Sequence, residues 1–243
     1  MLIINADDLG IDTATTDRIL NCFRDGRITS STTMMHMEDS ERSAELARAS
    51  NLPIGLHLNF TKPLSTHYIK STLKTRHDTL VRYFTRVRFA RIIYNPLIQR
   101  QVEYCFKAQY AEFERLYGKS PTHIDGHHHI HLCANLMFST IIPRGMKIRR
   151  NVPFSKKERN FVNWAWRSLI DSIIQHKFVT TDFFLGLYSN VCEIDILAKV
   201  SLARNYNVEF MVHPGMPEEY NFIMSDRYAH IIQNVPKGSY ESL

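Results

Sequence analysis

The sequence predicts an α/β protein in which about seven parallel strands form a distorted (β/α) barrel. Short β-rich runs alternate with segments of helical periodicity along the chain, and this alternation is typical of parallel sheets. About seven such units fit within 243 residues, as in a barrel domain. Ionisable side chains also follow several of the predicted strands, which is where the functional groups of such barrels gather.

Seven segments have the composition of strands, because they are short and rich in β-branched or aromatic residues. In chain order they are residues 2–5, 27–37, 53–60, 122–127, 146–152, 178–185 and 207–213. Five further segments have apolar residues at helical spacing. These are residues 12–24, 40–50, 98–116, 156–176 and 194–206. Asp12 is a suitable N-cap for the first of these helices.

The interval from about residue 64 to 96 is long for a simple connection. We therefore expect one domain over residues 1–243, with an inserted basic helix or lid at about 64–96 over the active face. The chain from residue 70 to 100 is rich in cations, which are Lys70, Lys74, Arg76, Arg82, Arg86, Arg88, Arg91 and Arg100. We favour a solvated helical face for them, while phosphate on a substrate, a membrane surface and nucleic acid stay open as partners.

Composition limits the class of protein. Hydrophobic residues make up 44% of the chain, and the formal net charge is +6. The four cysteines are scattered without a Cys-x-x-Cys pair, which argues against a disulfide framework or a cysteine zinc finger. No apolar run is long enough to span a bilayer. The first residues have the pattern of a strand rather than of a signal peptide, so we expect a cytoplasmic protein.

Residues 121–131, Pro-Thr-His-Ile-Asp-Gly-His-His-His-Ile-His, form the most informative segment. In an extended strand side chains alternate between two faces. One face would then carry His123, Asp125, His127, His129 and His131. Imidazole nitrogens beside a carboxylate are typical ligands of a divalent metal. Taken alone, this run would fit a solvated, His-rich loop equally well.

Three strand ends together favour a metal site. Asp7 and Asp8 end the first strand, His57 lies in the third and His127 ends the fourth. Two adjacent carboxylates could point in different directions, so that one binds a metal while the other accepts a proton. One Asp and two His from separate strands would form a facial triad with open positions, which is the mark of a catalytic metal site.

Two further strand ends carry candidate functional groups. His213 lies at the end of the last predicted strand, where an imidazole could act as a general acid, although it could also be a helix or turn cap. Arg149 and Arg150 follow the fifth strand. One of them could hold Asp7 in its charged form or orient a substrate, and an exposed basic turn is the alternative.

At these residues the chain resembles the YdjC/ChbG-like carbohydrate deacetylase family. The matching blocks are Asn-Ala-Asp-Asp-Leu-Gly (5–10), Gly-Leu-His-Leu-Asn (55–59), the segment 121–131 and His-Pro-Gly (213–215). The resemblance covers nearly the whole chain. It implies a barrel related to polysaccharide deacetylases and glycoside hydrolases, one divalent metal (Mg²⁺ or Zn²⁺), and removal of acetyl groups from N-acetylated saccharides such as chitooligosaccharides.

The resemblance also implies roles for individual residues. Asp8, His57 and His127 would be the metal ligands, Asp7 the catalytic base and His213 the acid. The side chains expected to bind or orient the substrate are Asn59, Asp125, His129 and Arg149. Between residues 64 and 96 the chain departs from the family pattern, because the segment is basic and helix-like.

Two other functions stay open at this stage. A metal-dependent phosphoesterase of the barrel type would use the basic segment for phosphate, but it normally needs more carboxylates to bridge two metals. A non-catalytic protein that binds an anionic ligand is the other alternative, and it rests on charge alone. We expect no nucleic-acid partner, because no recognised nucleic-acid module is present. A homodimer is the default assembly, since dimers are the commonest oligomers.

Overall fold

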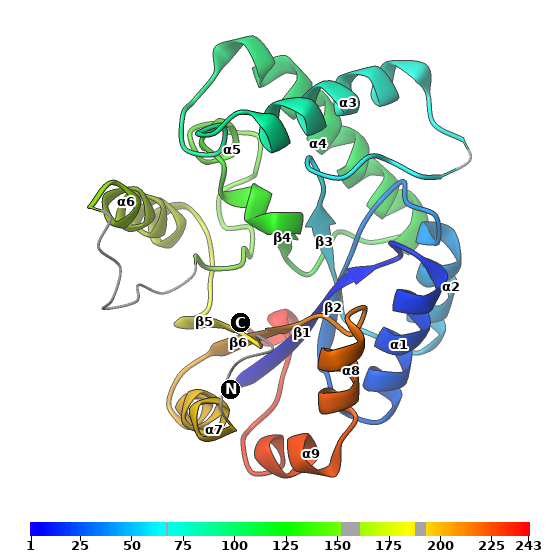
Figure 1. Cartoon of the computed structure of the whole chain (residues 1–243), viewed down its shortest axis with the longest axis vertical. Coiled ribbons are helices and arrows are strands. Elements are labelled where there is room, and N and C mark those ends of the chain that lie inside the picture. The colour runs from blue at the N-terminus through cyan, green and yellow to red at the C-terminus, as the bar shows by residue number, and fades with distance from the viewer. Residues whose placement is uncertain (67, 152–160, 188–192) are drawn as a thin grey trace.

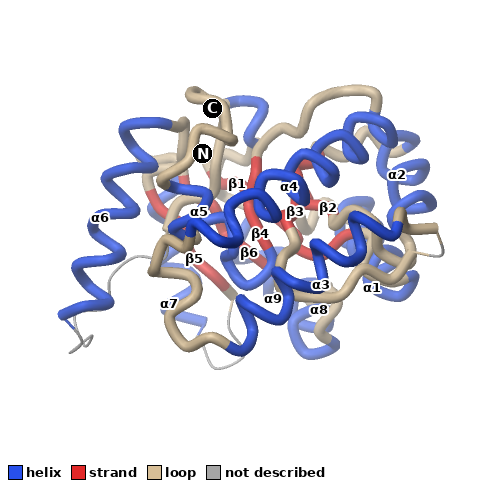
Figure 2. The backbone as a smooth tube through the Cα atoms, turned by 90° about the horizontal axis from the view of Figure 1, so that it is seen from above, coloured by secondary structure: helices blue, strands red, loops and turns tan. Residues whose placement is uncertain are grey.

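The computed structural model describes residues 1–66, 68–151, 161–187 and 193–243. Within them, parallel strands form one sheet with helices around it (Figures 1 and 2). The strands are β1 (Leu2–Leu9), β2 (Ser30–Thr33), β3 (Ile54–Leu58), β4 (Ile124–Gly126), β5 (Phe183–Gly186) and β6 (Val208–Val212). Their order across the sheet is β4-β3-β2-β1-β6-β5. The predicted α/β class and parallel pairing are confirmed, with six strands in a curled half-barrel.

The fifth expected strand, residues 146–152, is wrong as a continuous strand in the described part of the chain. Lys147 and Ile148 form only single bridges, to Val179 and Ile124 respectively; residue 152 lies outside the described residues. These bridges nevertheless join the β4 edge to the chain that precedes β5. The sheet therefore curls toward closure, and Arg149 follows directly on the closing segment.

The strands are surrounded by helices, which Figure 2 shows on the outside of the sheet. They are α1 (Thr13–Arg24), α2 (Ser40–Ala49), α3 (Ser71–Arg86), α4 (Pro96–Tyr117), α5 (Ala134–Met137), α6 (Phe161–Lys177), α7 (Glu193–Ser201), α8 (Pro217–Ile223) and α9 (Asp226–Ile232). As expected, the side chain of Asp12 caps α1 by accepting a hydrogen bond from the Thr15 amide. The first part of the helix predicted over 156–176 lies outside the described residues.

The short helices α8 and α9 were not predicted, because seven residues are too few to show a clear helical period. None of the described helices has both the length and the apolar character needed to cross a membrane.

The basic segment between β3 and α4 contains α3, which crosses α4 at the top of Figure 1. Its apolar side points inward: Leu80 is fully buried, and Phe84 stacks on Phe60 with ring centroids 6.2 Å apart. The imidazole of His77 contacts the Asn59 carbonyl oxygen, with 2.9 Å between Nε2 and O. Helix α3 therefore holds the turn that follows β3 against the body of the protein.

Strand β1 lies in the middle of the sheet, and nearly all of its side chains are buried, as in strands covered on both faces. Its pairing with β2 is irregular between Ala6 and Leu9. Asp8 has a φ of +73°, a left-handed conformation that Asp adopts more readily than most residues. This irregularity directs Asp7 and Asp8 into different surroundings.

The strand predicted over residues 122–127 is shorter than expected, and the alternation predicted as far as His131 is wrong. Strand β4 ends at Gly126, and a 3₁₀ turn covers His127–Leu132. Within that turn His128 and His129 are left-handed, with φ of 54° and 57°. Because the chain turns here, His129 and His131 do not continue the face of the strand that carries His123 and Asp125.

Candidate metal centre

Asp8, His57 and His127 come together at the carboxyl ends of three strands. One ligand atom from each lies within 4.8 Å of the other two. The Asp8 Oδ1 atom is 3.2 Å from His57 Nε2 and 3.0 Å from His127 Nδ1. One carboxylate and two imidazoles are a suitable set for a divalent metal, so these residues fit the metal that the sequence implies.

The ring of His57 is oriented from behind by Asp125. Its Nδ1 donates to Asp125 Oδ1 at 2.8 Å, and the two residues are register partners in β3 and β4. The Thr32 hydroxyl donates to Asp125 Oδ2 at 2.9 Å. A carboxylate on one ring nitrogen sets the tautomer and leaves the other nitrogen for a metal. His57 therefore presents Nε2 toward Asp8.

Arg149 lies fully buried at the centre of a carboxylate cluster. It donates to both oxygens of Asp7, at 2.7 and 2.6 Å, and Nε donates to Glu209 Oε1 at 2.8 Å. Asp125 Oδ2 lies 2.7 Å from Nη2. One guanidinium thus links β1, β4 and β6. The carboxylates behind the candidate metal centre are therefore already paired with this one cation.

The charges of this network reinforce one another. Burial raises the pKa of Asp7, but the charge and hydrogen bonds of Arg149 outweigh it and hold that pKa well below its usual range. Burial also raises the pKa of Asp8, and hydrogen bonds from His127 and His57 more than reverse the effect. Burial lowers the pKa of His57, but Asp125 and Asp7 raise it well above the ordinary value. The carboxylates around His57 therefore favour positive charge at this point, whether a proton or a bound cation supplies it.

His213, after β6, faces Asp7 across the site. Its Nε2 lies 3.9 Å from Asp7 Oδ2, and its Nδ1 lies 3.6 Å from Glu219 Oε1. Burial lowers the pKa of His213, but the neighbouring carboxylates of Glu219 and Asp7 raise it above the usual value. The ring is thus held in position by Glu219, and its protonated form is favoured.

A cavity of about 570 Å³ opens over these groups. Asp7, Asp8, His57, His127 and His213 all line it, and so does His129. The volume is in the range of sites that accept small molecules. The three candidate metal ligands are therefore reachable from outside, as a catalytic centre requires.

Three of the residues expected to bind or orient substrate, Asn59, Asp125 and Arg149, do not line the cavity. Asn59 is fully buried and does not line the cavity. Its side chain accepts from the amides of Thr61 and Lys62, which shapes the turn after β3. Asn59 therefore shapes the turn after β3 and does not reach the cavity, and its role in binding or orienting substrate stays a prediction. Asp125 is also buried, and it orients His57 rather than facing the cavity.

The sequence reasoning missed several residues that support the site. Glu209 is an acidic residue in the middle of an otherwise apolar strand, and that is a signal that could have identified it. Thr32 and Glu219 gave no comparable signal, because hydroxyls in strands and acids in helices are ordinary. Arg91 lies within the basic segment, and it lines the cavity while donating to the His128 carbonyl oxygen at 2.8 Å.

The fold and this cluster define an α/β half-barrel protein with a candidate metal centre at the carboxyl ends of its strands. The model of the YdjC-like protein family matches residues 1–237, so the chain belongs to that family. The resemblance noted from the sequence motifs is thereby confirmed.

Curated relatives and solved structures resemble the chain, and two of the relatives are deacetylases by name. A carbohydrate deacetylase of Clostridium beijerinckii is 30% identical over 236 residues, which covers 94% of this chain and 86% of the relative. A chitooligosaccharide deacetylase of Proteus mirabilis is 36% identical over 146 residues, covering 59% of this chain but only 53% of the relative. The match thus spans about half the length of the Proteus protein.

One solved structure is that of an Enterococcus faecalis protein described as a candidate cellobiose-phosphate cleavage protein. It superposes with a TM-score of 0.68 at 21% identity, over 99% of this chain and 97% of that one. At this level of identity the likeness supports the fold alone.

Proposed function

We propose that this chain is a metal-dependent carbohydrate deacetylase, which hydrolyses the acetamide group of an N-acetylated sugar to acetate and a free amino sugar. The observation that carries the proposal is the meeting of Asp8, His57 and His127 within 4.8 Å, on a cavity that also exposes Asp7 and His213. The names of the two curated relatives support the same activity.

The chemistry of the donor set supports one divalent metal, Mg²⁺ or Zn²⁺, held by Asp8, His57 and His127. When bound there, the metal would polarise the acetyl carbonyl and assist the ionisation of water. Asp125 supports this role from behind, because its hydrogen bond with Nδ1 directs Nε2 of His57 toward the ligand group.

Asp7 is the proposed general base. Arg149 keeps its carboxylate ionised, since it holds the pKa of Asp7 well below its usual range against the effect of burial. An ionised carboxylate on the cavity can accept a proton as the oxygen of water bonds to the acetyl carbon. Asn5 Nδ2 also donates to Asp7 Oδ1 at 3.0 Å, which fixes the orientation of the carboxyl group.

His213 is the proposed general acid. As the bond between the acetyl carbon and the sugar nitrogen breaks, the imidazolium donates its proton to the leaving amine. Its raised pKa suits this role, because the ring must carry a proton near neutral pH. Glu219 contacts the opposite ring nitrogen, so Nε2 is the atom that faces the cavity.

An acetate-release assay tests the proposal. The protein is incubated with a panel of N-acetylated mono- and oligosaccharides, free and phosphorylated, with and without a chelator. We expect acetate and amino sugar in equal amounts, and a loss of turnover with the chelator that added Mg²⁺ or Zn²⁺ restores. Near-normal turnover and metal content in a His57→Ala variant would refute the ligand set.

A phosphoesterase with two metals is less well supported. Among the described residues, the other groups that could hold an ion include Asp7, Asp125 and Glu209. All three are paired with the Arg149 guanidinium. Metal stoichiometry separates the two functions, since the deacetylase proposal requires one ion per chain.

A further inference from the structure

An exposed apolar surface lies on the turn that connects α3 to α4. Val87, Phe89, Ile93, Tyr94 and Leu97 expose between 44% and 83% of their area within eleven consecutive residues. We call these residues, together with Arg86, Arg88 and Arg91, which line a hollow beside them, the α3–α4 surface. Large apolar side chains that gather on an exposed turn mark a contact with another molecule or with a membrane.

The chain that forms and flanks this surface is strongly cationic. From Thr79 to Val102 the chain contains Arg82, Arg86, Arg88, Arg91 and Arg100 and no acidic residue. The contacts that these arginines make are with neutral groups. Arg82 Nε donates to the Asp78 carbonyl oxygen, and Arg88 lies over the Phe89 ring at 4.9 Å. No ion pair of these arginines occurs among the described residues, so their charge is available to an anionic partner.

The α3–α4 surface is continuous with the mouth of the candidate active site. Arg91 lines the catalytic cavity, and it also lines a second hollow of about 380 Å³ formed by residues 84–92. Arg86, Arg88 and Phe89 line that second hollow too. A molecule seated on this surface would therefore lie next to the entrance used by the sugar.

We propose that the α3–α4 surface docks on an anionic lipid bilayer, and that the N-acetylated sugar entering the cavity is the head group of a lipid. The assignment of the substrate rests on the deacetylase function proposed above, whereas the docking itself does not. Exposed aliphatic and aromatic side chains would enter the interface, and the arginines would contact lipid phosphates. Stable attachment to a membrane surface needs such a pair of signals.

The charge pattern favours a bilayer over a second copy of the chain. A two-fold dimer centred on this surface would place the same arginines opposite one another, and like charges in contact are unfavourable. The aliphatic character of Val87, Ile93 and Leu97 favours lipid over nucleic acid, since nucleic-acid surfaces use aromatic rings on which bases stack.

Vesicle co-sedimentation of the full chain tests the docking. Vesicles of phosphatidylcholine with phosphatidylglycerol are compared with vesicles of phosphatidylcholine alone, at low and high salt. We expect binding to the anionic vesicles only, and a decrease as salt rises. Arg86→Gln with Arg88→Gln should weaken the partition by about 25-fold, from roughly fivefold per arginine. Phe89→Ser with Ile93→Ser should also weaken it.

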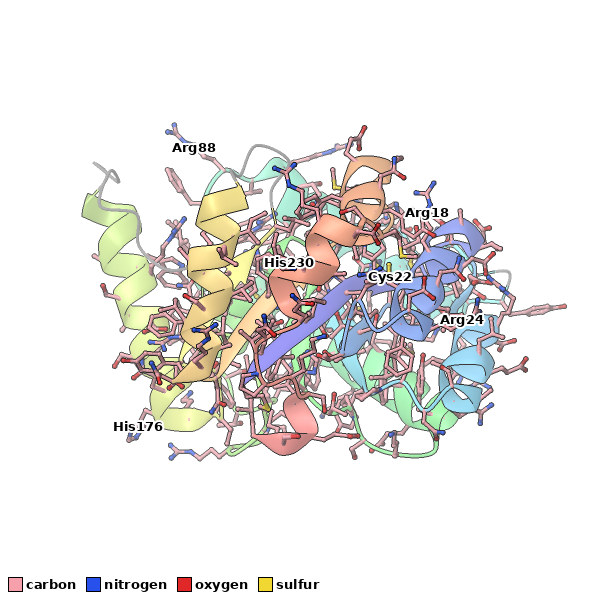
Figure 3. The ribbon with its side chains drawn as sticks, turned by 90° about the horizontal axis from the view of Figure 1, so that it is seen from below. Arg18, Cys22, Arg24, Arg88, His176 and His230 are labelled. Atoms are coloured by element: carbon pink, nitrogen blue, oxygen red, sulfur yellow. The ribbon has the colours of Figure 1, made fainter. Side chains whose placement is uncertain are left out.

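Matched control variants test whether vesicle binding depends on this surface or only on the total charge and the number of exposed apolar side chains. Arg24→Gln with Arg48→Gln removes the same charge from α1 and α2, and Figure 3 shows Arg24 far from Arg88. Leu169→Ser with Leu197→Ser removes two exposed leucines from α6 and α7. We expect both controls to bind as the wild type does. Equal losses in the controls, equal binding to uncharged vesicles, tighter binding to a single-stranded oligonucleotide, or a dimer that forms through this surface would overturn the docking.

A second measurement separates the docking from the chemistry. Acetate release is compared for an N-acetylglucosaminyl lipid in anionic vesicles and for a soluble N-acetylated disaccharide. We expect the ratio of the two rates to favour the lipid, and to fall in the Phe89→Ser/Ile93→Ser variant. An unchanged ratio would overturn the lipid substrate. No acetate from either substrate, with vesicle binding intact, would refute the deacetylase function and leave the docking in place.

Discussion

Arg149 and Asp7 form a buried bidentate ion pair. The two terminal nitrogens of the guanidinium donate to the two carboxylate oxygens at 2.6 and 2.7 Å. Asp7 belongs to the central strand, whereas Arg149 follows the single bridges that curl the sheet. The same guanidinium also contacts Asp125 and Glu209. The pair therefore connects the closure of the sheet with the position of the proposed base.

Arg149→Met should destabilise the protein by about 3–5 kcal/mol, because it leaves buried carboxylates without their partner. Arg149→Lys keeps the charge but loses the planar fork, so it should remain destabilising. The neighbouring Arg150 is the matched control. It makes a two-point pair with Asp171, and about a quarter of each side chain is exposed. Arg150→Met should cost less than Arg149→Met, because water can reach the partly exposed carboxylate that loses its partner. Urea unfolding measures both, and equal losses would contradict the central role of Arg149.

Glu209 makes stability depend on pH. Burial raises the pKa of Glu209 to about 7, although Arg149 and the hydrogen bond from Tyr240 act against it. As pH rises, the unfolded chain loses this proton near the ordinary pKa of 4.5, whereas the folded state keeps it to higher pH. Stability attributable to Glu209 is therefore complete below about pH 4.5 and is lost as pH rises toward about 7.

Glu209→Gln should remove this dependence, since glutamine resembles the protonated acid. Between pH 5 and 8 the free energy of unfolding of the wild type should fall by on the order of 1–3 kcal/mol relative to that of the variant. The exposed Glu218→Gln serves as control, and its pH curve should follow that of the wild type. Unfolding free energies at four pH values measure the difference. Parallel curves for wild type and Glu209→Gln would show that Glu209 stays ionised.

The meeting of Asp8, His57 and His127 could be predicted from the sequence, because the ends of parallel strands share one edge of the sheet. The use of Arg149 rather than Arg150 could not, since adjacent residues point to opposite faces and the pattern does not say which faces inward. The left-handed turn at His128 and His129 was also beyond the pattern. The alternation of side chains predicted beyond Gly126 requires an extended strand, but β4 ends at Gly126.

Removing a metal ligand should lower the metal affinity more than removing the residue that orients this ligand. Asp125→Asn weakens the hydrogen bond that orients His57, and should reduce metal affinity by about 10–100-fold. His57→Ala should reduce it further, because a donor atom is removed. His230→Ala is the control, since this histidine lies exposed on α9 and outside the cavity. Isothermal titration with Zn²⁺ measures the affinities. Equal affinities in Asp125→Asn and wild type would contradict the supporting role.

The pH dependence of turnover should report His213. Since the proposed acid must be protonated, activity should fall as pH rises through the raised pKa of His213. Glu219→Gln removes a partner that raises this pKa, so the alkaline fall should move to lower pH while activity at low pH is largely kept. His213→Gln should lower kcat by roughly 100-fold or more and abolish the alkaline fall. Profiles of kcat against pH for the three proteins measure these effects. An unchanged alkaline limb in Glu219→Gln, or a persistent one in His213→Gln, would assign the proton donor to another group.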